Sequence, residues 1–134
     1  MEEGTYERAS MGSRKVGSYV IIDGIPCKVV QVETSSPGKH GSAKVRLTAV
    51  GIFEGQKKSI VLPSHSDIEV PVLLKKKAQV VSTTDTSAQL MDSETFEVYE
   101  VPITEEFQGK LSPGKEVEVM ETMGRKAISR VWGS

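Results

Sequence analysis

Asparagine is absent from this chain of 134 residues, and cysteine occurs only once. Without asparagine, the tight turns depend on glycine, proline, aspartate and serine, so the positions of the glycines carry structural information. The single cysteine, Cys27, excludes an internal disulfide. Its neighbours Ile25 and Val29 predict a small buried side chain rather than a nucleophile, and a reducing compartment agrees with this use of cysteine.

Long apolar runs are also absent, since none approaches the roughly 18 residues that a transmembrane helix needs. The first fifteen residues are polar and contain no apolar core, so no secretory signal is expected. A hydrophobic fraction of 37% with 26% charged residues is typical of a folded soluble domain. We therefore expect a cytoplasmic protein without a membrane partner.

Residue groups typical of catalytic or metal sites are missing. His40 and His65, with Cys27 far away in the sequence, lack the spacing of zinc ligands. Residues 109–116 (GKLSPGKE) match the start of a P-loop, but Glu116 stands where a magnesium-binding hydroxyl is required, and the VEVM that follows alternates like a strand. The sequence predicts no metal site, no cofactor, no small-molecule substrate and no enzymatic activity.

Short strands separated by turns dominate the sequence. In residues 43–50 (AKVRLTAV), apolar residues alternate with Lys44, Arg46 and Thr48, which places these three side chains on the solvent face of a strand. Asp23-Gly24, between two apolar runs, predicts a hairpin turn. The further expected strands are 17–23, 25–32, 57–62, 68–72, 78–82, 88–92, 95–101, 115–120 and 126–132.

The number and spacing of these strands predict an all-β protein of closed or sandwiched sheets. Pro71 cannot donate to a central ladder and belongs at an edge or crossing, and a run of lysines at 75–77 follows it. The net charge changes from +4 over residues 28–58 to −2 over residues 70–134. We predict two small barrels, residues 1–69 and residues 70–134, with residues 1–14 flexible.

Residues 36–42 (SPGKHGS) present one lysine, Lys39, in a turn too small to hide it. Pro37 stiffens the chain before it, and Gly38 and Gly41 permit a close approach or a positive φ. Such a loop projects one long cationic side chain. Basic residues elsewhere in this half of the chain could neutralise phosphates, and the candidates for RNA contact are Lys28, Lys44, Arg46, Lys57 and Lys58.

Residues 34–44 (TSSPGKHGSAK) closely resemble the modification loop of translation initiation factor 5A, in its archaeal form. The resemblance extends over most of the chain, from VGSYVIIDGIPCKVV through GIFEGQKK to the C-terminal strands, and its GKHGxAK core is highly specific. It implies that Lys39 becomes hypusine. The modification loop then comprises Pro37, Gly38, His40, Gly41, Ser42 and Lys44, while Ser36 departs from the lysine that many members carry.

The same resemblance implies an N-terminal SH3-like barrel and a C-terminal OB-fold. It implies binding at the ribosomal E site, in contact with rRNA and peptidyl-tRNA. There the factor would promote peptide-bond formation at stalled sequences such as proline runs, and aid termination. Deoxyhypusine synthase would be a further partner, which transfers an aminobutyl group from spermidine to Lys39.

Two other classes of protein stay open at this point. The first is a general RNA-binding β-barrel protein that uses the basic stretch without modification. The second is an enzyme with a Schiff-base lysine, which is disfavoured because Lys39 has no apolar pocket to lower its pKa. The related elongation factor P of bacteria fits less well, because its chain carries an additional domain.

Overall fold

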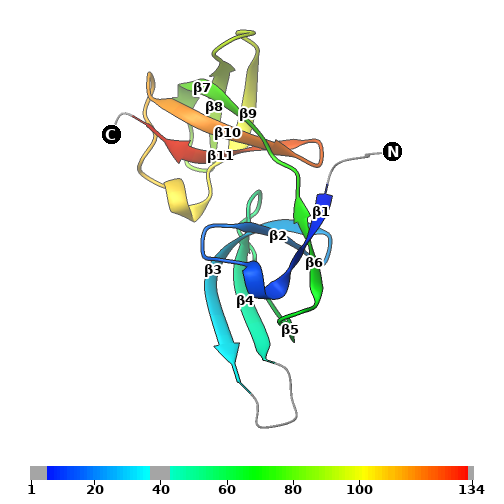
Figure 1. Ribbon diagram of the computed structural model, residues 1–134. Helices are drawn as coiled ribbons and strands as arrows, with labels where there is room; N and C mark the ends of the chain where they lie inside the picture. Colours follow the sequence, from blue (N-terminus) through cyan, green and yellow to red (C-terminus); the bar gives the residue numbers. More distant parts are fainter. Residues whose placement is uncertain (1–5, 37–42, 133–134) are drawn as a thin grey trace. The chain divides into compact units, whose positions relative to one another are not determined.

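The computed structural model describes residues 6–36 and 43–132, and it divides the chain into two compact units, Met1–Val72 and Leu73–Ser134 (Figure 1). We call them unit 1 and unit 2. Each is built almost entirely of antiparallel strands that curl around a hydrophobic core of their own. The predicted all-β class with two barrel-like sheets is confirmed. In the part of the chain that is described, no helix has the length and apolar character needed to cross a lipid bilayer.

Unit 1 contains a four-stranded meander whose strands lie side by side in sequence order. These strands are β2 (Tyr19–Ile22), β3 (Ile25–Ser35), β4 (Lys44–Gly51) and β5 (Lys57–Pro63). Asp23 and Gly24, with φ of 55° and 76°, form the predicted β2–β3 turn. Cys27 is completely buried in the core of unit 1, and burial raises the pKa of its thiol, as a structural rather than a reactive cysteine requires.

The first described residues differ from the expectation that residues 1–14 are flexible. Tyr6–Ser10 form β1, which pairs with β6 (Asp67–Pro71), and a 3-10 turn, η1 (Met11–Ser13), follows. Met11 is fully buried, and its N–H donates to the Ser66 carbonyl at 2.8 Å. The burial of Met11 and the pairing of β1 with β6, a strand far along the chain, give this polar segment a defined structure. Pro71 lies at the end of β6 in this two-stranded sheet, the edge position predicted for it.

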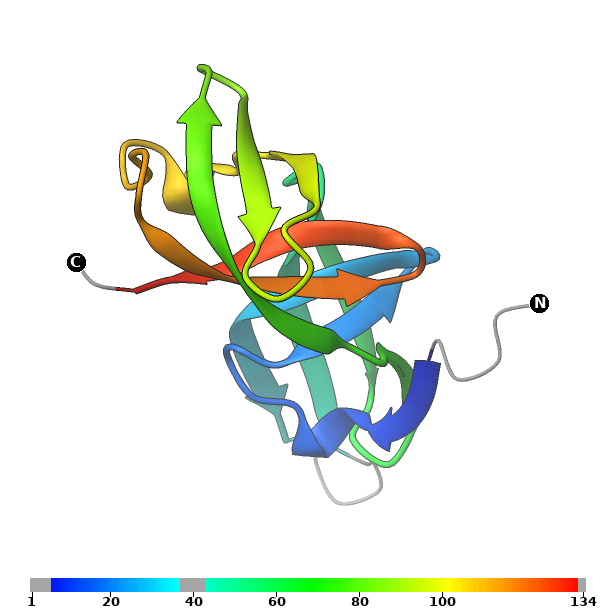
Figure 2. The ribbon, with the colours of Figure 1, turned by 90° about the horizontal axis from the view of Figure 1, so that it is seen from above.

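Unit 2 is one five-stranded sheet in the order β11-β10-β7-β8-β9. The strands are β7 (Leu74–Thr83), β8 (Ser87–Asp92), β9 (Val98–Pro102), β10 (Glu116–Thr122) and β11 (Arg125–Val131), with a 3-10 turn, η2 (Glu105–Phe107), before β10. The first half of β7 pairs with β10 and its second half with β8, so β7 runs through the whole unit (Figure 2). A bulge between Val80 and Ser82 supplies the bend that this path needs.

The lysine run at 75–77 belongs to a strand, although the sequence predicts that β7 begins only at residue 78. Lys77 lies opposite Glu118 of β10, and Lys75 approaches the Glu118 carboxylate at 3.7 Å. Lys76 is 3.9 Å from Glu121 on the same strand. The glutamates of β10 therefore supply opposite charges beside the lysines, which allows the strand to begin at Leu74.

The turn between β8 and β9 contains a non-glycine residue, Phe96, with a positive φ. The expected strand 95–101 begins only at Val98, because Phe96 has a left-handed φ of 63° and its side chain is 67% exposed. The turn is closed by the Phe96 N–H, which donates to the Asp92 carbonyl at 2.9 Å. The N–H groups of Thr95 and Glu94 donate to Asp92 Oδ1, which holds the pKa of this carboxyl below its usual value.

Replacing Phe96 by glycine should raise the free energy of unfolding by about 0.5–1 kcal/mol. A side chain in the left-handed region costs roughly 1–2 kcal/mol, part of which the greater flexibility of glycine in the unfolded chain offsets. Urea unfolding followed by Trp132 fluorescence measures the change. Phe96→Ala is the matched control, since it removes the same ring but keeps Cβ. Equal stabilities for the two variants would contradict the strain argument.

Candidate functional site

The segment that carries Lys39 connects two strands that lie side by side. Ser35, the last residue of β3, pairs with Lys44, the first residue of β4, so residues 36–43 leave and rejoin the sheet at adjacent points. The Ala43 carbonyl accepts a hydrogen bond from the Ser64 N–H at 2.9 Å, which attaches the base of the connection to the end of β5. Lys39 itself, with Pro37, Gly38, His40, Gly41 and Ser42, lies outside the described residues.

Lys44 and Arg46 lie on the outer face of the sheet of unit 1, as the alternation in β4 predicts. Both are exposed, whereas Val45, which lies between them, and Leu47, which follows Arg46, are buried. Arg46 Nε is 3.8 Å from Glu33 Oε1 on β3, and both side chains are more than half exposed. Such a surface pair contributes about 0–1 kcal/mol and exchanges readily for a stronger anion. Two cations therefore stand directly behind the Lys39 connection.

Lys28 and Lys57 lie on the same outer face but at its far end. Val50 of β4 pairs with Lys28 on one side and with Lys57 on the other, so the three residues form one row across the sheet. Val50 lies about 20 Å along β4 from Lys44, at about 3.3 Å per residue. The outer face thus carries two separate cationic positions rather than one continuous patch.

Lys58 does not share this face. It pairs with Ala49, whose side chain is buried in the core of unit 1, so Lys58 projects from the opposite side of β5. There its Nζ lies 3.4 Å from Asp23 Oδ2 in the β2–β3 turn. Because consecutive strand residues face opposite sides, the sequence alone indicates that Lys57 and Lys58 lie on different faces. It does not indicate which of them faces outward. The structure places Lys28, Lys44, Arg46 and Lys57 on one face, in two separate positions, and puts Lys58 on the other side.

Neither metal nor P-loop chemistry finds support in the described part of the chain. No three His, Cys, Asp or Glu side chains among residues 6–36 and 43–132 are placed to hold a metal ion. After Gly109-Lys-Leu-Ser-Pro-Gly-Lys115 the chain enters β10 rather than a helix, so the helix N-terminus that a P-loop needs is not formed there.

Comparison with known proteins identifies the family. A family profile described as "Translation initiation factor 5A-like, N-terminal" matches residues 5–66, and one described as "Eukaryotic elongation factor 5A hypusine, DNA-binding OB fold" matches residues 72–131. A translation initiation factor 5A from Thermofilum pendens is 52% identical over 122 residues, which cover 90% of this chain and 92% of that protein. The chain belongs to the translation initiation factor 5A family.

Other members of the translation initiation factor 5A family give the same result. The protein from Methanocaldococcus jannaschii is 46% identical over 127 residues, which cover 95% of this chain and 96% of that one. A solved structure titled as the eukaryotic translation initiation factor 5A from Methanococcus jannaschii matches with a TM-score of 0.74 at 44% identity, over 96% of this chain and 98% of that one. A family member from Naegleria fowleri matches with a TM-score of 0.66 at 28% identity, over 95% of this chain and 98% of that one. The family is one of translation factors, not of enzymes.

One group of residues that the sequence analysis did not select lies in unit 2. Lys110 and Lys115 line a pocket together with Leu111 and Val131. The sequence did contain a pointer to them, since both lysines belong to the P-loop-like string at 109–116. Val131 follows 16 positions after Lys115, at the end of β11, so no local pattern could have joined it to them.

Proposed function

We propose that this factor acts on the ribosome through a hypusine or deoxyhypusine side chain at Lys39. The observation that carries the proposal is the placement of the connection 36–43, which joins two paired strands and has exposed Lys44 and Arg46 at its base. In a member of the translation initiation factor 5A family, this is the segment that contains the GKHG sequence.

The modification lengthens Lys39 and adds a second cationic nitrogen. Deoxyhypusine synthase, acting as a partner, transfers the aminobutyl group of spermidine to the Lys39 amine: the bond from this group to the secondary nitrogen of spermidine breaks, a new carbon–nitrogen bond forms at Lys39, and 1,3-diaminopropane leaves. The product can bridge phosphates and hydroxyls that an unmodified lysine cannot reach together. Lys44 and Arg46, and further along the face Lys28 and Lys57, would hold the rRNA backbone and so orient the modified side chain.

The factor would bind near the ribosomal E site and hold the acceptor end of the peptidyl-tRNA. Restraining a mobile reactant lowers the entropic part of the barrier to peptide-bond formation, which matters most at slow sequences such as proline runs. A tenfold acceleration corresponds to about 1.4 kcal/mol, which one or two charge-assisted contacts can supply. The same placement would aid termination.

This function requires no bond chemistry from the chain itself. We propose a cytoplasmic factor with no cofactor, no metal, no membrane partner and no small-molecule substrate of its own. Spermidine enters only as the donor for the separate modifying enzyme.

Reconstituted translation of a message with a proline run tests the proposal. The modified protein, purified from its native source and verified by intact mass, should relieve the stall by about tenfold, an effect equal to about 1.4 kcal/mol of barrier. The unmodified chain should relieve it far less. An intact mass without any addition to Lys39, or equal activity of both forms, would refute the proposal.

The alternative is an RNA-binding protein that needs no modification. The cations that share the outer face of unit 1 favour it, because they can bind a phosphate backbone whatever the state of Lys39. Equal activity of the modified and unmodified forms would select this alternative.

A further inference from the structure

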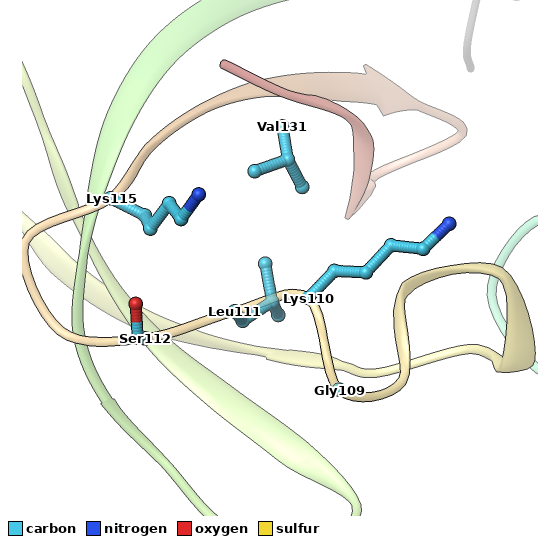
Figure 3. A pocket seen from close by; sticks show the side chains of 6 residues that line it. All are labelled: Gly109, Lys110, Leu111, Ser112, Lys115 and Val131. Carbon is cyan, nitrogen blue, oxygen red and sulfur yellow. The ribbon is translucent and has the colours of Figure 1, made fainter. Parts of the chain in front are cut away.

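A pocket of about 450 Å³ lies in unit 2 at the end of β11, and Figure 3 shows the side chains around it. We call it the 109–115 pocket, after the loop that forms most of its wall. Its lining residues are Gly109, Lys110, Leu111, Ser112, Lys115 and Val131. The volume is within the range of about 300–1,000 Å³ that is usual for ligand pockets.

The loop of the pocket is held by backbone hydrogen bonds on both sides. The Lys110 N–H donates to the carbonyl of buried Phe107 at 3.1 Å, next to Gly109 with a φ of 75°. On the other side the Gly114 N–H donates to the Val80 carbonyl at 2.9 Å, and the Val80 N–H donates to the Lys115 carbonyl at 2.8 Å. The bases of both lysine side chains are thus attached to the core of unit 2.

The chemistry of the wall is divided into a cationic and an apolar part. Lys115 extends toward the space between Leu111 and Val131, whereas Lys110 starts beside Leu111 and extends outward on the side opposite Lys115 (Figure 3). A ligand in the pocket would therefore meet an aliphatic surface in the middle and an ammonium group on each side.

These two lysines differ from the other lysines of unit 2. Lys75 pairs with Glu118, and Lys76 and Lys126 pair with Glu121, at 3.7–3.9 Å. Lys77 stands over the Trp132 ring, 5.5 Å from its centroid. In the described part of the chain, neither Lys110 nor Lys115 has a carboxylate within ion-pair distance. Among the lysines of unit 2, Lys110 and Lys115 are therefore the two for which the described residues supply neither a carboxylate nor a ring.

We propose that the 109–115 pocket binds one nucleotide of a single-stranded RNA. Lys110 and Lys115 bind the phosphates on either side of the nucleotide, and Leu111 and Val131 contact the face of its base. A single strand is required, because a duplex keeps its bases stacked and cannot insert one into a pocket of this size. The assignment of RNA as the polymer rests on the proposed ribosomal function.

The affinity of this pocket should be moderate. Residues 70–134 carry a net charge of −2, so contacts inside the pocket rather than long-range attraction must hold the strand. None of the described residues that line the pocket carries an aromatic ring, so they do not provide the stacking that a free mononucleotide would need. An RNA strand that is also bound elsewhere on the protein or on the ribosome suits such a site better than a free mononucleotide does.

The experiment measures binding of the unmodified full-length chain to a fluorescent oligouridine of about ten nucleotides, within the site size of OB-folds. Lys110→Gln combined with Lys115→Gln should weaken binding three- to tenfold. It should also reduce the slope of log affinity against log salt by about 1.4, at about 0.7 per phosphate contact. In the wild type, the methyl resonances of Leu111 and Val131 should shift on addition of the RNA, while those of Leu74 stay in place.

Lys75→Gln combined with Lys76→Gln is the matched control, because it removes the same charge from the same unit away from the pocket. Equal losses in the two double variants, or none in the pocket variant, would overturn the proposal. Displacement of the RNA by a polyglutamate peptide at equal concentration would also overturn it, since charge alone would then explain binding. The assay contains neither ribosomes nor modified Lys39, so its failure leaves the translation test of the proposed function unaffected.

Discussion

Replacing Lys39 by arginine should give a folded protein that no longer speeds translation through proline runs. Arginine keeps the positive charge but removes the primary amine to which the aminobutyl group is added. The expected loss is the whole acceleration that the modified protein provides, about tenfold or about 1.4 kcal/mol of barrier. The measurement compares modified wild type, unmodified wild type and Lys39→Arg in reconstituted translation of a proline-rich message.

Two further measurements make this result decisive. The melting temperature of Lys39→Arg should equal that of the wild type, because the β3–β4 pairs end at Ser35 and Lys44 and do not include position 39. A message without proline runs should be translated equally with all three proteins. Equal relief of the stall by all three would overturn the hypusine proposal and leave the unmodified RNA-binding protein as the explanation.

Truncation of Leu90 to alanine should destabilise unit 2 by about 2–5 kcal/mol, the cost of a buried leucine and the cavity it leaves. Leu90 is completely buried in the core of unit 2, between Val80 of β7 and Tyr99 of β9 on the neighbouring strands. Trp132 is the only tryptophan and belongs to unit 2, so its fluorescence in urea follows the unfolding of this unit.

Leu74→Ala is the control for this truncation, because it makes the same change on a side chain of the same unit that is 59% exposed. Its effect should stay below about 1 kcal/mol. A loss of similar size in both variants would show that the cost comes from strand propensity rather than from burial.

Much of unit 1 could be predicted from short stretches of sequence. The alternation in residues 43–50 correctly places Lys44 and Arg46 on the outer face of β4, and Asp23-Gly24 forms the predicted turn. Both features depend only on near neighbours, because strand periodicity and turn preferences act over a few residues. The prediction that Lys39 lies at the tip of a loop likewise depends on only seven residues, 36–42, and Lys39 lies outside the described part of the chain.

Two features of the strands became visible only in the folded structure. A bulge in β3 between Val29 and Gln31 reverses the alternation, so Glu33 faces outward beside Arg46 instead of toward the core. Tyr6–Ser10 read as a polar tail, yet they form a strand because β6, far along the chain, lies beside them. A single inserted residue or a distant partner decides such outcomes, and a local pattern contains neither.

By itself, the sequence determined the all-β class, the connection that carries Lys39 and the outward cations behind it. The tertiary structure decided which cations lie on the outer face of unit 1, and so placed Lys57 there and Lys58 on the opposite side. It also brought Val131 beside Lys110 and Lys115 to form the 109–115 pocket. The physical reason is that strand periodicity is set by bonds between successive residues, whereas a shared face or a pocket depends on which distant strands pair and in which register.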